Sequence, residues 1–149
     1  MFEIEVFDDK GGVDKNIIDK FESEIGYKLP EDYKNLLSIH NALTPEKCDF
    51  DFIFKGVEDE RDVSFLGYGN GVESYCKIDR LQQRDEGEKD IVVIGVSANG
   101  DYICFDYSKD PFTNNPPVIL MFHDLFDEND LMVKVPVAKT FYEFVKMLE

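Results

Sequence analysis

The stretch IDKFESEIGYKLPEDYKNLLSIHNAL, residues 18–43, predicts two short helices joined by a tight connection. Its apolar residues recur three and four positions apart, as they do on the buried face of a helix. We expect Asp14 to cap the first helix and Gly26 to end it, because glycine readily adopts the left-handed conformation found there. Pro30 suits the first position of a second helix, which is expected to end near His40.

The middle of the chain is predicted to be rich in β-structure. Three phenylalanines at alternate positions within residues 50–54 give the pattern of a half-buried strand. Residues 63–66 are the expected short partner of this strand. The glycine-rich segment GYGNG at residues 67–71 is interpreted as a structural loop, since glycine permits tight turns. A further helix is expected over residues 72–84.

A second hairpin is expected after a charged turn at residues 85–90. Residues 91–96 form a continuous apolar run of strand length, and residues 102–105 can return as the antiparallel partner. The dipeptide Asn-Gly at residues 99–100 favours a type I′ turn between them. A loop at residues 111–117 and a strand at residues 118–122 are expected to follow.

The end of the sequence predicts a closing helix. Ala138, Phe141, Val145 and Leu148 recur at helical spacing and mark one face. The length of 149 residues corresponds to one domain, and the chain contains no repeat, linker or low-complexity tract. We therefore predict a single α+β domain over residues 1–149, with an N-terminal helix pair, a mainly antiparallel sheet and a closing C-terminal helix.

Composition and charge exclude several classes of protein. Apolar residues make up 43% of the chain and aromatic residues 13%, which excludes a wholly disordered protein. The chain contains 16 Lys and Arg residues and 32 Asp and Glu residues, which gives a net charge of −16. This charge argues against direct binding to nucleic-acid phosphates or to an anionic membrane surface. A charged partner is expected to be basic.

The termini and cysteines indicate a location. The first residues, MFEIEVFDDK, lack the basic start and long apolar segment of a secretory signal. No apolar run reaches the ~18 residues of a membrane-spanning helix. Cys48, Cys76 and Cys104 are widely spaced and odd in number, which disfavours a disulfide framework or a CxxC metal site. We expect a protein of the reducing cytoplasm.

Residues able to support catalysis are scarce. The sequence contains no GxSxG, HExxH or P-loop motif. His40 and His123 are isolated and do not supply the three or four ligands of a zinc site. A nucleophilic pair of Cys104 with His123 is conceivable, but a small thiol within a strand is more often inert core. We predict no catalytic residue, no metal site and no cofactor; a carboxylate-based hydrolase would require a pocket with two carboxylates of opposed pKa shifts.

Acidic residues gather in three clusters, at residues 58–62, 85–90 and 124–130. The first interpretation of each cluster is a solvated loop that aids solubility, and the second is a surface for a basic partner. The last cluster lacks the glycine and the terminal glutamate of an EF-hand calcium loop. The candidate partner-binding residues, chosen for charge clustering in expected loops, are Glu58, Asp59, Glu60, Asp62, Asp124, Asp127, Glu128 and Asp130.

The order of these blocks resembles the SUKH superfamily, to which the fungal cell-wall-assembly regulators belong. The family shows an apolar-xx-Phe-Glu-xx-Ile-Gly-xx-Leu-Pro-xx-Tyr run, which is matched here by Ile18, Phe21, Glu22, Ile25, Gly26, Leu29, Pro30 and Tyr33. The segments VVIGVSANGDYICFDYS, PPVILMFHD and VAKTFYEFVKML resemble its central hairpin, closing strand and last helix. The sequence departs from the family where Asn-Gly-Gly is usual, because Asn41 is followed here by Ala42 and Leu43.

The resemblance implies a protein that acts by binding. Bacterial members are regarded as immunity proteins that neutralise polymorphic toxins, many of them nucleases, and eukaryotic members resemble regulators and scaffolds. On this basis we expect a non-enzymatic immunity protein that occludes a cognate toxin domain, with a basic nuclease as the expected toxin. The alternative is a regulatory or scaffold module in the control of the cell wall or envelope.

Overall fold

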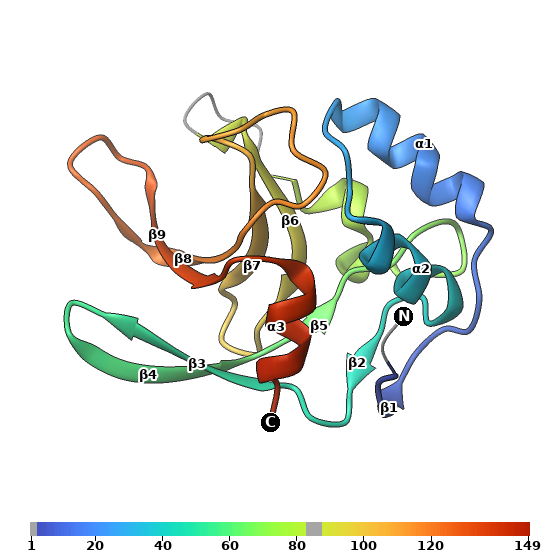
Figure 1. Cartoon of the computed structure of the whole chain (residues 1–149), viewed down its shortest axis with the longest axis horizontal. Helices are drawn as coiled ribbons and strands as arrows, with labels where there is room; N and C mark the ends of the chain where they lie inside the picture. The colour runs from blue at the N-terminus through green and yellow to red at the C-terminus, as the bar shows by residue number, and fades with distance from the viewer. Residues whose placement is uncertain (1–2, 83–87) are drawn as a thin grey trace.

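A five-stranded antiparallel sheet organises the computed structural model, which describes residues 3–82 and 88–149 (Figure 1). Neighbouring strands in this sheet follow the order of the chain. The helix pair lies on one side of the sheet, and two long hairpins extend on the opposite side (Figure 1). The strands are β5 (Ser64–Phe65), β6 (Ile91–Val96), β7 (Tyr102–Asp106), β8 (Val118–Phe126) and β9 (Met132–Ala138). The predicted α+β class is confirmed.

The N-terminal helix pair is confirmed as α1 (Lys15–Ile25) and α2 (Glu31–Ile39). Asp14 caps α1 by accepting a hydrogen bond from the backbone two residues further on, at 2.9 Å. Gly26 ends α1 with a φ of 78°, a conformation that glycine adopts without steric strain. Pro30 precedes the first helical residue of α2 as its N-cap, one position earlier than expected.

Polar contacts fix the end of α2. His40 follows the last helical residue, and its Nδ1 lies 2.6 Å from a carboxylate oxygen of Asp9. Asn41 is buried, accepts a hydrogen bond from the backbone N–H of Tyr68 at 2.8 Å, and donates one to its carbonyl at 2.9 Å. Ala42 has a φ of 52°, in the left-handed region that glycine occupies more readily. A glycine at this position would therefore fit the same backbone.

The predicted strand of alternating phenylalanines is confirmed as β3 (Asp49–Phe54), but its expected partner is wrong. The chain reverses at once and pairs β3 with β4 (Val57–Asp62), whereas β5 pairs with β6. Lys55 and Gly56 form the two-residue turn, with φ of 51° and 79°. Positive φ at both positions is typical of a type I′ hairpin turn. The first acidic cluster consequently lies on a strand and not in a loop.

The expected type I′ turn at Asn99 and Gly100 is wrong. The backbone N–H of Ser97 bonds to the carbonyl of Asp101 at 2.9 Å, so the hairpin between β6 and β7 has a three-residue loop. Gly100 has a φ of 96°, but Asn99 is not among the described non-glycine residues with positive φ. A three-residue loop needs only one left-handed residue, and Gly100 supplies it.

The helix expected over residues 72–84 is also wrong within the part that the structure describes. Two short 3₁₀ turns occupy Ser74–Cys76 and Ile78–Arg80, and residues 83–87 lie outside the described chain. The backbone of Gly67 bonds to both Cys76 and Ile78, at 2.8 and 2.9 Å. These bonds between separate segments of the chain replace the hydrogen bonds that a continuous helix would make.

Three further elements complete the fold. The closing helix is confirmed as α3 (Phe141–Met147), although Ala138 belongs to β9. Two short strands, β1 (Val6–Asp8) and β2 (Thr44–Pro45), pair with each other and were not expected. No helix within residues 3–82 and 88–149 is long and apolar enough to cross a membrane.

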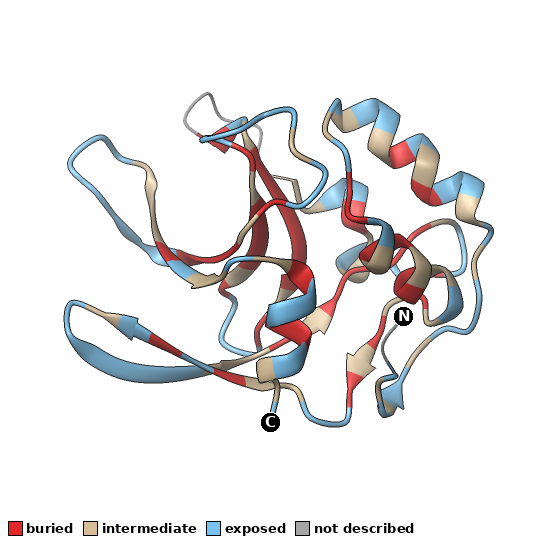
Figure 2. Cartoon of the chain, in the orientation of Figure 1, coloured by how far each residue is buried: buried red, intermediate tan, exposed pale blue. Residues whose placement is uncertain are grey.

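Aromatic rings fill the core between the helices and the sheet. Tyr33 packs edge-on against Phe105 and Phe141, with ring centroids 5.2 Å apart in both pairs. The hydroxyl of Tyr33 shares a 2.7 Å hydrogen bond with the hydroxyl of Tyr68, so both buried tyrosines are satisfied. Figure 2 shows burial concentrated on the strands and inner helix faces, whereas the hairpin ends are exposed.

Candidate functional site

The two long hairpins bring the first and third acidic clusters to the same side of the molecule. The β3–β4 hairpin carries residues 58–62, and the β8–β9 hairpin carries residues 124–130 (Figure 1). Strand β3 lies against β9, which connects the two hairpins at their base. The clusters are 62 residues apart in sequence at Asp62 and Asp124, and only the fold places them on neighbouring elements.

A groove of about 340 Å³ separates the hairpins. Phe52 and Phe54 of one hairpin face Phe122 of the other, with ring centroids 6.0 and 5.1 Å apart. Val57 and Leu125 extend this apolar lining, and both are exposed. The groove therefore combines an apolar wall from each hairpin with direct access to solvent.

Arg61 lies across the aromatic lining of the groove. Its guanidinium carbon is 5.2 Å from the ring centroid of Phe52 and 5.7 Å from that of Phe122. The same guanidinium lies 3.1 Å from a carboxylate oxygen of Asp59 and donates from Nε to Asp101 at 2.9 Å. Two carboxylates and two rings thus hold one arginine in place.

Asp101 joins the groove to the adjacent turn. Its side chain is 1% exposed and accepts hydrogen bonds from the backbone N–H of His123 at 3.0 Å and from Arg61. The Nδ1 of His123 lies 2.6 Å from the same carboxylate. Burial alone would raise the pKa of Asp101, but the bonds from His123 and then Arg61 hold it below its ordinary value.

On the outer face of the β3–β4 hairpin, acidic residues stand directly opposite one another. Asp49 pairs directly with Asp62, and Asp51 pairs with Glu60. A carboxylate oxygen of Glu149 lies within 4.8 Å of those of Asp51 and Glu60. The neighbouring charge of Asp49, followed by burial and the charge of Asp51, raises the pKa of Glu60 above its ordinary value. Directly opposed like charges destabilise a hairpin, so this face is not arranged for stability.

Three of the eight predicted partner-binding residues hold the local structure. Asp59 forms the ion pair with Arg61, and Asp62 accepts a 2.9 Å hydrogen bond from the backbone of Ala98. Asp127 accepts two backbone hydrogen bonds across the β8–β9 turn, at 2.8 and 3.1 Å. Asp124 lies on β8 and not in a loop. Within the described chain, no hydrogen bond or ion pair holds the carboxylates of the other five, which are Glu58, Glu60, Asp124, Glu128 and Asp130.

The middle acidic cluster is not a solvated loop where it is described. Glu88 is buried, and one carboxylate oxygen lies 2.7 Å from Nζ of Lys134. The other oxygen accepts a 3.1 Å hydrogen bond from the backbone of Met132. Asp90 accepts a hydrogen bond from the hydroxyl of Tyr27. Asp85 and Glu86 lie outside the described residues, and the remaining acidic groups of this cluster serve the fold.

Two carboxylate groupings resemble metal sites but lack the required features. Asp101, His123 and Asp124 place ligand atoms within 4.8 Å of one another. The Arg61 guanidinium already bonds to Asp101, and its positive charge opposes a cation there. The exposed grouping of Asp51, Glu60 and Glu149 has no further ligand among the described residues. Neither grouping supports assignment of a metal.

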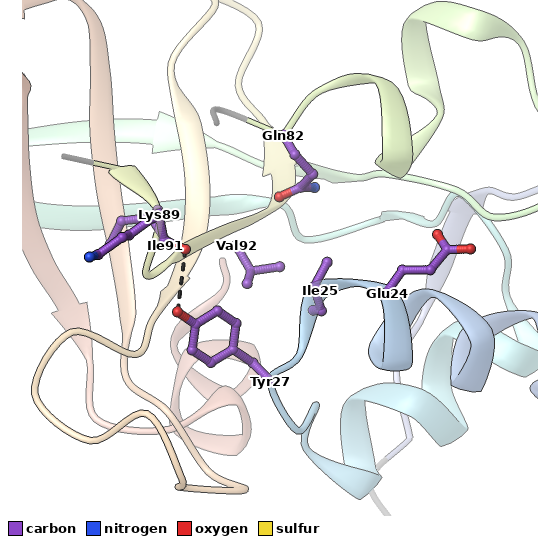
Figure 3. Close-up of a pocket in the computed structure, with 7 residues that line it drawn as sticks. All are labelled: Glu24, Ile25, Tyr27, Gln82, Lys89, Ile91 and Val92. Atoms are coloured by element: carbon purple, nitrogen blue, oxygen red, sulfur yellow. Dashed lines mark hydrogen bonds between the residues drawn. The ribbon is translucent and has the colours of Figure 1, made fainter. Parts of the chain in front are cut away.

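A second pocket of about 260 Å³ lies between α1 and β6 (Figure 3). Burial, and then the hydrogen bond to Asp90, raise the pKa of Tyr27 to about 12. The Gln82 amide is engaged by the backbone of Ile78 and Val93, at 2.8–3.0 Å. Among the described residues that line this pocket, Glu24 alone supplies a carboxylate, whereas hydrolysis by two carboxylates requires a pair.

Cys104 is not suited to nucleophilic chemistry. Its side chain is fully buried, and burial raises the pKa of the thiol well above its ordinary value. The Nδ1 of His123 is engaged with Asp101 and not with this thiol. The structure agrees with the interpretation of Cys104 as inert core.

Sequence reasoning missed the residues that shape the groove. Arg61 sits within an acidic run and gave no separate signal, and Asp101 was read only as part of a turn. The alternation of β3 did contain a usable signal, since it places Phe52 and Phe54 on the face opposite Asp51. Pairing this strand with the acidic residues after Gly56 would have predicted both faces of the hairpin.

Comparison with known proteins identifies the family. No curated protein and no solved structure matches the chain. The family model described as the SMI1 / KNR4 family (SUKH-1) matches residues 12–147, which includes the helix pair, both hairpins and all of α3. The chain therefore belongs to the SMI1 / KNR4 family (SUKH-1), within the SUKH superfamily.

Proposed function

We propose that this chain is a non-enzymatic immunity protein that binds a cognate, basic toxin domain and blocks its active surface. The observation that carries the proposal is the placement of two acidic clusters on adjacent hairpins beside an open apolar groove. Acidic residues at such a surface accelerate the approach of a basic partner and disfavour nucleic acid at the same place. Occupation of the toxin's phosphate-binding surface would then inhibit it without turnover.

The chemistry of the molecule supports binding over catalysis. Asp101, His123 and Arg61 engage one another, and the thiol of Cys104 is fully buried. Membership of the SMI1 / KNR4 family is consistent with an immunity role or with regulation of the cell wall. The proposal further places the protein in the cytoplasm, where a toxin with a nucleic-acid substrate would act.

A pull-down tests the proposal. The tagged chain is incubated with lysate of the producing cells and eluted with rising salt, and the eluted proteins are identified by mass spectrometry. We expect a basic toxin domain in a 1:1 complex, whose activity falls in proportion to added chain. Recovery of envelope or signalling proteins in its place would favour the regulatory alternative.

Charge reversal tests the surface. The variant Glu58→Lys/Asp124→Lys/Glu128→Lys changes exposed carboxylates on both hairpins and breaks no described hydrogen bond. We expect slower association with the recovered toxin and a flatter dependence of the rate on salt, because electrostatic steering is reduced. Unchanged affinity and salt dependence would show that the interface lies elsewhere.

A control variant carries the same change in net charge away from the hairpins. Glu3→Lys/Glu24→Lys/Asp79→Lys alters exposed residues near the start of the described chain, on α1 and in a 3₁₀ turn. We expect association and its salt dependence to change less than in the hairpin variant. Equal effects would show that overall charge, and not the hairpin surface, governs binding.

A further inference from the structure

We infer that the groove between the two hairpins is an anchor site for one large apolar side chain of the partner, flanked in the partner's sequence by lysine or arginine. The inference rests on the proposed function for the partner's identity and adds the chemistry of the contact. The groove's volume of about 340 Å³ exceeds that of a single leucine or phenylalanine side chain.

The lining determines that the inserted group is apolar. Phe52, Phe54 and Phe122 form the two facing walls, and Val57 extends them toward solvent. An aromatic lining could also attract a cation, but the guanidinium of Arg61 already covers two of these rings. A second cation in the groove would be repelled by Arg61, whereas an apolar side chain would gain contact with the rings.

The rim determines the charge of the flanking residues. Asp124 borders the groove on one side and has no hydrogen bond or ion pair in the described chain. Asp59 borders it on the other side, and its side chain remains 58% exposed despite its contact with Arg61. A cation on either side of the inserted residue would therefore find an acidic partner.

The exposed apolar residues favour the groove over the outer hairpin face. Val57 is 66% exposed at the groove, and Ile53 is 62% exposed on the opposite face of the same hairpin. Ile53 lies beside Glu58 and has no facing aromatic wall, whereas Val57 lies on the face with Phe52 and Phe54. These two β-branched residues are matched in exposure and differ in which face they occupy.

Peptide titrations of the full chain test the inference without the toxin. The probe is the acetylated, amidated peptide Lys-Arg-Leu-Arg-Lys, and the comparison peptides replace leucine by serine or all four cations by glutamate. Binding is followed by ¹⁵N–¹H NMR at low salt, with amides of Phe54, Val57 and Leu125 as reporters. We expect the leucine peptide to bind about tenfold more tightly than the serine peptide, and the acidic peptide not to bind.

Two matched variants locate the contact. Val57→Ser should weaken binding of the leucine peptide about fivefold or more, while Ile53→Ser should leave it unchanged. Equal binding of the leucine and serine peptides, or equal loss in both variants, would overturn the inference. If the chain binds the leucine peptide in the groove but does not inhibit the toxin, the immunity role alone is refuted. If the chain inhibits the toxin but binds the leucine and serine peptides equally, the anchor site alone is refuted.

Discussion

The half of the molecule that contains the helices and the half that contains the hairpins differ in how their polar groups are paired. Around α2, buried polar groups are paired, as in the Tyr33–Tyr68 hydroxyl bond and the two bonds of Asn41. The ammonium of Lys34 lies within 3.3 Å of three carboxylates. On the β3–β4 hairpin, carboxylates oppose each other directly and apolar side chains remain exposed.

This difference separates the part of the protein that stabilises the fold from the surface that we propose for recognition. Paired polar groups and packed rings stabilise the folded state, whereas opposed like charges and exposed apolar residues reduce its stability. The hairpin surface is therefore unfavourable for the isolated chain, and under the function that we propose this cost would be offset when a basic partner covers it. Four substitutions test this division, and we order them from the largest expected effect to the smallest.

Phe105→Ala is expected to have the largest effect. Phe105 is fully buried and packs against the rings of Tyr33, Tyr107 and Phe141. Truncation should lower the free energy of unfolding by about 3–5 kcal/mol, measured by urea denaturation. The control Phe126→Ala, at an exposed position on β8, should change it by less than about 0.5 kcal/mol. Similar losses of unfolding free energy at both positions would contradict the view that the core, and not the hairpin surface, stabilises the fold.

Asp101→Asn tests the junction between the two halves. The substitution keeps the shape of the side chain but removes the buried charge that faces Arg61 and His123. We expect a loss of about 3 kcal/mol at pH 7, because Arg61 then lacks one of its two carboxylate partners. The control Asp124→Asn, at an exposed residue without a described hydrogen bond, should leave stability unchanged.

The pH dependence of this variant has a definite sign. The pKa of Asp101 is lowered in the folded state, so its stabilising effect is complete above the unfolded value of about 3.9 and is lost as pH falls below it. The difference in unfolding free energy between Asp101→Asn and the parent should therefore shrink below about pH 4. A difference that stays constant down to pH 2 would show that the charge of Asp101 contributes nothing.

The sequence predicted the elements whose signals are local. Asp14 and Gly26 mark the ends of α1 through their own conformational preferences, and the spacing of apolar residues marks the buried face. The alternation around Phe52 likewise identifies β3 without reference to any other segment. Family resemblance then gave the order of these elements and the protein-binding role that we propose.

The remaining errors arise where tertiary contacts override local preference. Lys55 adopts a positive φ that is unusual for lysine, because the facing strands close the hairpin at that point. Asn99 was the stronger turn signal, yet bonds between Ser97 and Asp101 set a longer loop. The groove depends on register between β3–β4 and on the approach of β8, and neither is encoded within one segment. The acidic clusters were visible in the sequence, and their role in binding stays a prediction. The face on which each residue of β4 lies follows only once β3 is paired with β4.

Lys55→Asn is expected to stabilise the β3–β4 hairpin and so to show that its turn lowers the stability of the parent chain. Lys55 has a φ of 51°, and asparagine tolerates this left-handed conformation better than lysine. The substitution should raise the free energy of unfolding by about 0.5–1 kcal/mol in urea denaturation. The substitution also removes the contact of the Lys55 ammonium with the Phe54 ring. The control Lys55→Gln removes the same contact and keeps a side chain of similar length. We expect this control not to raise the free energy of unfolding.

Glu60→Gln is expected to have the smallest effect and reports most directly on the outer hairpin face. Glu60 stands opposite Asp51, and the raised pKa of Glu60 means that the folded state binds its proton more tightly than the unfolded state does. The ionised carboxylate therefore destabilises the fold above its ordinary pKa of about 4.3, and the penalty disappears as the pH falls. Removing the charge should raise Tm by about 1–2 °C at pH 7 and low salt.

The control for this substitution is the neighbouring Glu58→Gln. Glu58 stands opposite Ile53, so its removal relieves no directly opposed charge. Calorimetry should show a rise in Tm for Glu60→Gln that exceeds the rise for Glu58→Gln at pH 7. The two rises should converge as the pH falls below the ordinary pKa of glutamate, because the raised pKa of Glu60 leaves this carboxyl protonated in the parent chain. An equal rise for both at pH 7 would mean that net charge alone destabilises the chain. In that case the directly opposed carboxylates would not account for the reduced stability that we infer for the outer face of the hairpin.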